Sequence, residues 1–257
     1  MNRRQFLTTT VTAAAVSTFA GAADAAASRC YELRVYSAAE GKLDALNTRF
    51  REHTCALFVK HGITNIGYWL PLENPERKLY YVLSYPDRAA REASWKAFMA
   101  DEDWKKAAAE SEKNGKLVEK VESTFLTTTD FSPEVKPEKK DPARVFELRI
   151  YTTGPGNLPK LHERFRKHTV ALFSKHGMSN FGDWKLDAGQ KGADDTLLYL
   201  LSHASKEACA ASFDAFRKDP EWIAARDASE KEAGGSLTVK DGVKSILMAP
   251  TDYSPSR

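Results

Sequence analysis

The feature that most constrains this chain is a long internal repeat. Residues 49–69 and 164–184 are identical at 14 of 21 positions, with a constant offset of 115 residues. Matching segments continue on both sides, and the offset grows to 118 and then to 122 as the loops lengthen. A repeat with so long a period means that one domain of about 100 residues occurs twice. Any fold of this chain must therefore be built from two copies of one unit.

Each copy presents strand and helix patterns in the same order. In the first copy, residues 43–57 carry apolar side chains at spacings of three and four, which predicts an amphipathic helix. A second helix is expected from Asp87 to about Ala100, and a short third helix begins near Asp101. Strand patterns cover residues 30–36, 63–70, 78–84 and 117–128.

The resulting order, β-α-β-β-α-(α)-β, is the split βαβ order of a ferredoxin-like sheet. Helices cover one face of such a sheet, and the other face needs a partner, which the second copy supplies. We therefore predict an α+β fold in which two tandem ferredoxin-like βαββαβ units pack sheet to sheet as a pseudo-dimeric α+β barrel. The expected segments are a signal peptide at 1–25, domains at 29–133 and 144–255, and a linker at 134–143.

The N-terminus has the pattern of an export signal. Arg3 and Arg4 precede a mild apolar segment, and small residues follow around Ala25. This resembles a twin-arginine (Tat) signal, which a receptor reads and which does not anchor the protein. We expect cleavage near Ala25 and a periplasmic mature protein. A cytoplasmic protein with a disordered start and a retained membrane helix are the alternatives, although the apolar run is shorter than the roughly 18 residues that a spanning helix needs.

The charge of the mature chain is close to neutral. Without Arg3, Arg4 and Asp24, 36 basic and 34 acidic residues remain, a formal charge of +2. Interspersed charges of both signs argue against nucleic acid or an anionic membrane surface as a partner. We expect no nucleic-acid partner and no stable membrane anchor.

The three cysteines do not follow the repeat. Cys30, Cys55 and Cys209 align with Val145, Val170 and Arg91, and the chain has no CxxC pair. Neither a symmetric disulfide nor a thiol nucleophile is indicated, so buried or incidental cysteines are the favoured interpretation.

The repeated motifs resemble those of the NIPSNAP family. They are the strand YELRVY/FELRIY, the helix end LFxKHG, the following GxW, a DxxW segment and the closing FSP/YSP, from about Arg29 to Pro255. The resemblance implies a dimeric α+β barrel, a superfamily that includes cofactor-free monooxygenases, haem enzymes and small-molecule binding proteins. The family carries no settled enzymatic activity, and a fold does not by itself decide between these functions.

Two histidines are the catalytic candidates. His53 and His168 fall within the apolar stripe of the first helix in each copy. Each could act as a general base in a cleft between helix and sheet. A core histidine bonded to a neighbouring strand or loop is the favoured alternative. His61 and His176 are expected at helix ends.

The first strand of each copy places charged and aromatic side chains on one face. Glu32 and Glu147 lie among them, so a structural ion-pair network is favoured over recognition of a ligand carboxylate by the arginines. Tryptophans of the second strand are expected to fill core or to line an apolar pocket, as are Trp104 and Trp222. The ligand-binding candidates are Arg34, Tyr36, Trp69, Arg149, Tyr151 and Trp184.

No metal site or cofactor is predicted. The sequence has no pair of histidines four residues apart, no HExxH, no P-loop, no GxGxxG and no GxSxG motif. A haem held by one axial histidine stays open.

The leading hypothesis is an exported binding or accessory protein whose partner is a small, partly apolar ligand. A cofactor-free oxygenase or isomerase-like enzyme and a structural interaction module are the alternatives. The two repeats are expected to pair within the chain, and a higher oligomer stays open.

Overall fold

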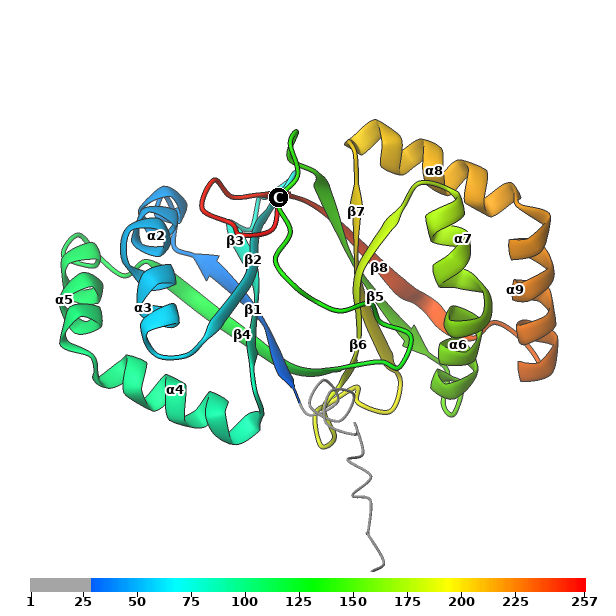
Figure 1. Ribbon diagram of the computed structural model, residues 1–257, viewed down its shortest axis with the longest axis horizontal. Helices are drawn as coiled ribbons and strands as arrows, with labels where there is room; N and C mark the ends of the chain where they lie inside the picture. Colours follow the sequence, from blue (N-terminus) through cyan, green and yellow to red (C-terminus); the bar gives the residue numbers. More distant parts are fainter. Residues whose placement is uncertain (1–28) are drawn as a thin grey trace, which may run out of the picture.

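The computed structural model describes residues 29–257, so the signal peptide predicted at 1–25 lies outside the described residues. Figure 1 shows two helical layers on opposite sides of a central group of strands. No helix in the described range is long and apolar enough to cross a lipid bilayer.

The first copy comprises β1 (Cys30–Ala38), α2 (Leu43–Arg49), the π-helix η1 (Phe50–Thr54), α3 (Cys55–Lys60), β2 (Thr64–Pro71), β3 (Lys78–Tyr85), α4 (Arg88–Ala100), α5 (Glu102–Ser111) and β4 (Val118–Thr128). The second comprises β5 (Val145–Thr153), α6 (Leu158–Arg164), the π-helix η2 (Phe165–Thr169), α7 (Val170–Lys175), β6 (Ser179–Leu186), β7 (Thr196–His203), α8 (Lys206–Lys218), α9 (Pro220–Ala233) and β8 (Thr238–Pro250).

The strands form one closed antiparallel barrel, which confirms the predicted α+β barrel of two ferredoxin-like units. Each copy contributes a four-stranded sheet, in the orders β4-β1-β3-β2 and β8-β5-β7-β6. The sheets also join edge to edge, where β2 pairs with β8 and β4 pairs with β6. Closure leaves neither sheet with an open edge.

The barrel interior is an apolar core shared by both copies. Trp69 and Trp184 are 1% and 0% exposed, and each ring contacts an aromatic ring of the other copy. The Trp69 ring lies 5.2 Å from that of Phe146, and the Trp184 ring lies 5.9 Å from that of Tyr31. The repeated GxW motif follows from this packing, because a Cβ on Gly67 would lie 2.2 Å from the Trp69 ring. Only glycine leaves room for the indole.

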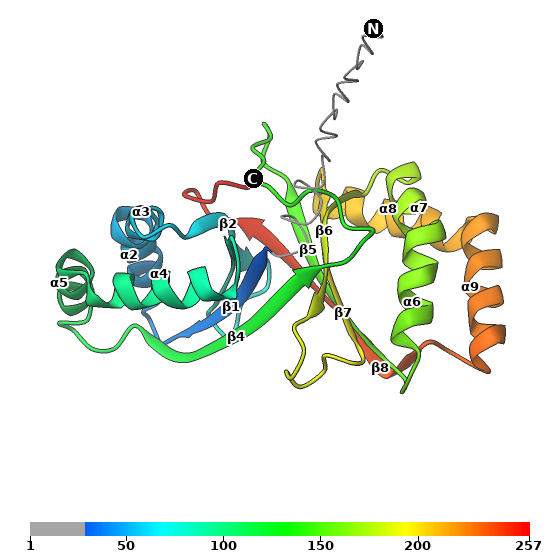
Figure 2. The ribbon, with the colours of Figure 1, turned by 60° about the horizontal axis from the view of Figure 1, so that its bottom comes forward.

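The helices cover the outer face of each sheet. In Figure 2, α2 to α5 lie together on one side of the strands and α6 to α9 on the other. Asp87 caps α4 by accepting from the Ala90 amide (2.7 Å), and Ser205 caps α8 by accepting from the Ala208 amide (3.1 Å). Each helical layer encloses its own apolar core against its sheet.

A π-helical turn corrects one prediction about the first helix. His53 and His168 are exposed, whereas the next residues, Thr54 and Thr169, are buried. The extra residue in each π-turn rotates the chain that follows by about 100°, so that the threonine replaces the histidine on the inner face. Each threonine hydroxyl donates to the carbonyl five residues earlier, at 3.2 Å. The expected burial of both histidines is therefore wrong.

The two copies exchange the short segments that follow their last strands. The Asp252 carboxylate accepts two bonds from the Arg51 guanidinium (both 2.8 Å), and Tyr253 packs in the helical core of the first copy. Asp130 likewise accepts from Arg166 (2.6 and 2.7 Å), and Phe131 packs in the helical core of the second copy. The repeated Thr-Asp-aromatic-Ser-Pro motif thus holds the copies together.

Candidate functional site

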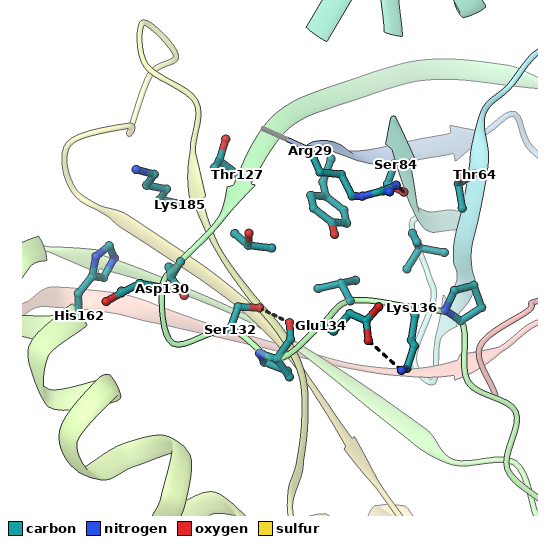
Figure 3. A pocket seen from close by; sticks show the side chains of 17 residues that line it. Arg29, Thr64, Ser84, Thr127, Asp130, Ser132, Glu134, Lys136, His162 and Lys185 are labelled. Carbon is teal, nitrogen blue, oxygen red and sulfur yellow. Dashed lines mark hydrogen bonds and ion pairs between the residues drawn. The ribbon is translucent and has the colours of Figure 1, made fainter. Parts of the chain in front are cut away.

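A large open cleft lies where the linker between the copies crosses the end of the barrel. Its volume is about 1150 Å³, and Tyr31, Ile66 and Val135 give it an apolar floor. Figure 3 shows His162, Asp130 and Lys185 at one side of the view and Arg29, Ser84 and Thr64 at the other. The cleft therefore combines apolar surface with polar groups of both copies, as ligand sites commonly do.

His162 is a half-buried polar side chain that lines this cleft. Its Nε2 atom is buried and neither accepts nor donates a hydrogen bond within the described part of the chain. In the first copy the equivalent residue is Asn47, whose Oδ1 accepts from the hydroxyl of Tyr253 (2.6 Å). The counterpart of Tyr253 beside His162 is Phe131, which has no hydroxyl. Its ring lies edge-on to the imidazole, with 5.5 Å between the ring centres. An unpaired buried polar atom costs about 1–3 kcal/mol, so His162 is a place where a ligand would gain a contact.

The cleft combines a histidine whose pKa is lowered with cations that have no ion-pair partner among the described residues. Burial and the nearby charge of Arg166 lower the pKa of His162 below its usual value. The acidic side chains of the cleft already have partners, since Asp130 binds Arg166 and Glu134 binds Lys136 (2.8 Å). Within residues 29–257, neither Arg29 nor Lys185 forms an ion pair.

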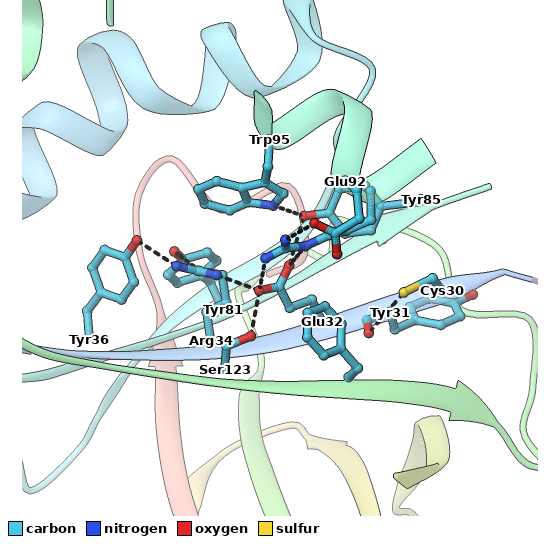
Figure 4. Close-up of polar contacts among 12 residues, drawn as sticks. Cys30, Tyr31, Glu32, Arg34, Tyr36, Tyr81, Tyr85, Glu92, Trp95 and Ser123 are labelled. Carbon is cyan, nitrogen blue, oxygen red and sulfur yellow. Dashed lines mark hydrogen bonds and ion pairs between the residues drawn. The ribbon is translucent and has the colours of Figure 1, made fainter. Parts of the chain in front are cut away.

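A second polar cluster lies between β1 and α4, away from the barrel interior. Arg91 binds both carboxylate oxygens of Glu32, each at 3.0 Å, and Ser123 and Tyr85 donate to the same carboxylate at 2.6 and 3.1 Å. Figure 4 shows Arg34 reaching from this carboxylate to Tyr36. Burial raises the pKa of Glu32, but the bonds from Arg91 and the charge of Arg34 outweigh it and hold that pKa below its usual range. This satisfied network has the character of a structural ion-pair cluster.

The second copy keeps part of this network and changes the rest. Arg149 binds Glu147, Tyr151 and Tyr199 as Arg34 binds their counterparts. His203 and Cys209 stand in place of Tyr85 and Arg91, and with Glu147 they bring three metal-ligand atom types within 4.8 Å of one another. These are the residues that could hold a metal ion.

Asp183 is a buried carboxyl that replaces Tyr68 of the first copy. It is 0% exposed, and burial raises its pKa to about 7. Its Oδ2 accepts from the amide of Asn180 (2.5 Å), while its Oδ1 finds no partner among residues 29–257. Its backbone N–H donates to the Ser132 hydroxyl (3.0 Å) on the wall of the cleft.

The structure separates the ligand-binding candidates into two places. Arg34 and Tyr36 face the helices of the first copy, and Arg149 and Tyr151 face those of the second. Trp69 and Trp184 lie on the opposite face of each sheet, inside the barrel. His53 and His168 lie on exposed helix surface, and His168 borders a small pocket of about 160 Å³ beside α9. None of these eight residues lines the large cleft.

Sequence reasoning missed His162, Asp183 and His203. Each occupies a position where the copies differ, opposite Asn47, Tyr68 and Tyr85. A search for substitutions between the copies would have found them, because identical positions in a pseudo-symmetric barrel mostly serve the shared fold.

Solved structures with a similar fold include three enzyme candidates. A candidate monooxygenase from Fusobacterium nucleatum aligns at 12% identity over 87% of this chain and 93% of that one, with a TM-score of 0.59. A candidate monooxygenase from Lactobacillus acidophilus aligns at 11% identity over 87% and 94%, with a TM-score of 0.55. A candidate chlorite dismutase aligns at 12% identity over 88% and 96%, with a TM-score of 0.50. At these identities the likeness concerns the fold alone.

No curated protein matches the sequence significantly. The sequence profile of the NIPSNAP family, in contrast, matches residues 31–133 and 146–255. The match covers both copies and includes the GxW, exchanged-segment and first-strand motifs whose packing is described above. The chain therefore belongs to the NIPSNAP family, as a tandem member with two domains in one polypeptide.

Proposed function

We propose that this protein binds a small, partly apolar organic anion in the cleft beside His162. The observation that carries the proposal is the buried Nε2 of His162, which has no partner within the described chain although Asn47 at the equivalent position has one. A rotation of the imidazole toward the cleft would let a ligand oxygen accept from or donate to this nitrogen, according to the tautomer. The apolar floor of Tyr31, Ile66 and Val135 would receive the rest of the molecule.

The charges of the lining support an anionic ligand. Arg29 and Lys185 bring positive charge to opposite sides of the cleft in Figure 3, and the carboxylates of Asp130 and Glu134 are bound to cations. A carboxylate would complement these cations, and a neutral His162 would add a hydrogen bond.

The test is ligand capture followed by matched variants. Native mass spectrometry of the protein purified from its native source would show a bound small molecule. Isothermal titration with a panel of aromatic and aliphatic carboxylates would then measure affinity. The double variant Phe131→Tyr/His162→Asn recreates the Asn47–Tyr253 pair of the first copy, so it should fold normally and bind at least about 10-fold more weakly. Unchanged affinity in this variant would place the ligand elsewhere.

An oxygenase or isomerase-like enzyme is the second candidate, favoured by the same histidine. A neutral imidazole in a cleft can remove an acidic proton from a bound substrate. The monooxygenase candidates among the structural neighbours have the same fold. Oxygen uptake with captured ligand, abolished in His162→Gln, would support this function. An absorption spectrum of the purified protein would reveal haem through its Soret band.

We also propose export through the Tat pathway, on the pattern Arg3-Arg4-Gln5-Phe6-Leu7. Changing both arginines to lysine should leave an uncleaved precursor in the cytoplasm, because lysine does not reproduce the planar guanidinium. Cell fractionation measures this, and mature protein appearing undiminished in the periplasm would contradict the proposal.

A further inference from the structure

The second copy contains a buried group of metal-ligand side chains that has no counterpart in the first. Glu147 on β5, His203 at the end of β7 and Cys209 on α8 are 2%, 1% and 5% exposed. The Oε2 atom of Glu147 lies 3.2 Å from His203 Nε2 and 3.8 Å from Cys209 Sγ. All three ligand atoms lie within 4.8 Å of one another.

These separations are within a few tenths of an ångström of those in a tetrahedral metal site. Zinc binds oxygen and nitrogen at about 2.0–2.2 Å and thiolate sulfur at about 2.3 Å, so two ligand atoms on a tetrahedron lie roughly 3.3–3.6 Å apart. The two observed distances lie on either side of that range. The ligand set of carboxylate, imidazole and thiol also suits zinc better than magnesium or calcium, which prefer oxygen.

Comparison with the first copy shows what the group replaces. There the carboxylate of Glu32 receives the guanidinium of Arg91 in a two-pronged contact, each N–O distance being 3.0 Å. Cys209 occupies the equivalent position, and His203 stands where Tyr85 donates to Glu32. The second copy has thus exchanged a fixed cation for two side chains that can bind one.

The remaining contacts of the carboxylate are the same in both copies. Glu147 Oε1 accepts from Ser245 Oγ and from Arg149 Nη1, both at 2.5 Å. These bonds hold one oxygen of the carboxylate and leave Oε2 directed at His203 and Cys209. Such hydrogen bonds to the far oxygen orient a carboxylate ligand.

Where Arg91 contacts the carboxylate in the first copy, Oε2 of Glu147 instead lies beside His203 Nε2 (3.2 Å) and Cys209 Sγ (3.8 Å). The Nδ1 atom of His203 is buried and has no hydrogen-bond partner between residues 29 and 257. A divalent cation would displace the thiol proton to solvent and make the thiolate a ligand.

We propose that Glu147, His203 and Cys209 bind one divalent metal ion of the zinc class, through Oε2, an imidazole nitrogen and the thiolate sulfur. A water molecule would complete four-fold coordination. The ion takes the place that the Arg91 guanidinium holds in the first copy, so the two copies satisfy the same buried carboxylate with different cations.

The experiment uses the full metal-free chain titrated with Co²⁺, which reports tetrahedral thiolate coordination through its charge-transfer and visible absorption bands. We expect one Co²⁺ per chain, displaced by Zn²⁺. The chain has three cysteines, so the double variant Cys30→Ala/Cys55→Ala leaves Cys209 as its one thiol and should keep the charge-transfer band. Cys209→Ser should lose the band, and His203→Gln should weaken binding by at least the roughly 10–100-fold caused by changes to outer-shell partners.

A matched variant keeps the test valid if single changes unfold the protein. Cys209→Arg with His203→Tyr rebuilds the arrangement of the first copy, so it should fold and bind no Co²⁺ at this position. Absence of a thiolate band in the wild-type protein would overturn the proposal. Survival of the band in Cys209→Ser would overturn it as well, because another thiol would then be the ligand.

Discussion

At the scale of single residues, the candidate ligand-binding and metal-binding side chains lie at positions where the two copies differ. The identical positions serve the fold: arginines and tyrosines tie the first strands to the helices, and glycines admit the tryptophans of the barrel. At three of the differing positions the second copy has a buried polar atom without a partner among residues 29–257, namely His162 Nε2, Asp183 Oδ1 and His203 Nδ1, and at a fourth it has the thiol of Cys209. The pairs, first copy then second, are Asn47 and His162, Tyr68 and Asp183, Tyr85 and His203, and Arg91 and Cys209.

The raised pKa of Asp183 predicts how the stability of the protein changes with pH. Burial raises its pKa from 3.8 to about 7, so the folded protein holds this proton more tightly than the unfolded chain does. The stability that the bound proton contributes is full below about pH 4 and is lost as pH rises through about 7. Asp183→Asn removes this loss, so it should stabilise the protein by as much as about 4 kcal/mol above pH 8 and by far less near pH 4.

Urea denaturation at several pH values measures the difference. Asp130→Asn is the control, because Arg166 lowers the pKa of Asp130 and the pH dependence then has the opposite sign. An Asp183→Asn effect that does not change with pH would show that folding does not raise the pKa of Asp183.

At the scale of elements, the first helix of each copy shows what the pattern of apolar residues can and cannot predict. The spacing of apolar residues correctly predicts a helix and its end at His61-Gly62 and His176-Gly177. It does not reveal the π-turn, because an inserted residue changes the periodicity by a single position within an otherwise regular stripe. The buried residue is consequently displaced from His53 to Thr54, although the element itself is predicted.

The π-turn predicts contrasting effects of neighbouring substitutions. Thr54→Ala and Thr169→Ala remove a buried hydroxyl bond and a methyl group, so each should cost about 1–2 kcal/mol of unfolding free energy. His53→Ala and His168→Ala alter exposed side chains and should each cost less than about 0.5 kcal/mol. Urea midpoints of the four variants test this. Histidine variants that lose as much as the threonine variants would restore the buried-histidine interpretation.

At the scale of the whole molecule, the repeat and its strand order were enough to predict the barrel, but not the cleft. The sheet faces could be assigned because alternating side chains along a strand belong to opposite faces. The cleft is formed by the linker, the ends of several strands and one residue of α6, so its lining is brought together only by the arrangement of both copies. Its key residue, His162, has no distinguishing pattern in its own helix.

The exchanged segments lead to a prediction about chain cleavage. A chain divided between Lys140 and Asp141 leaves Phe131 in the first half and Tyr253 in the second, and each ring packs in the helical core of the other half. Each separate half would also expose its apolar barrel face and two unpaired sheet edges, which favours self-association or aggregation. We therefore expect co-expressed halves to form a one-to-one complex, which co-purification through a tag on one half and native mass spectrometry would detect.

Phe131→Ala or Tyr253→Ala should weaken that complex clearly, whereas Asp252→Ala breaks an exposed ion pair with Arg51 and should cost no more than about 1 kcal/mol. Two soluble monomers that do not associate would mean that the barrel is not the unit that folds.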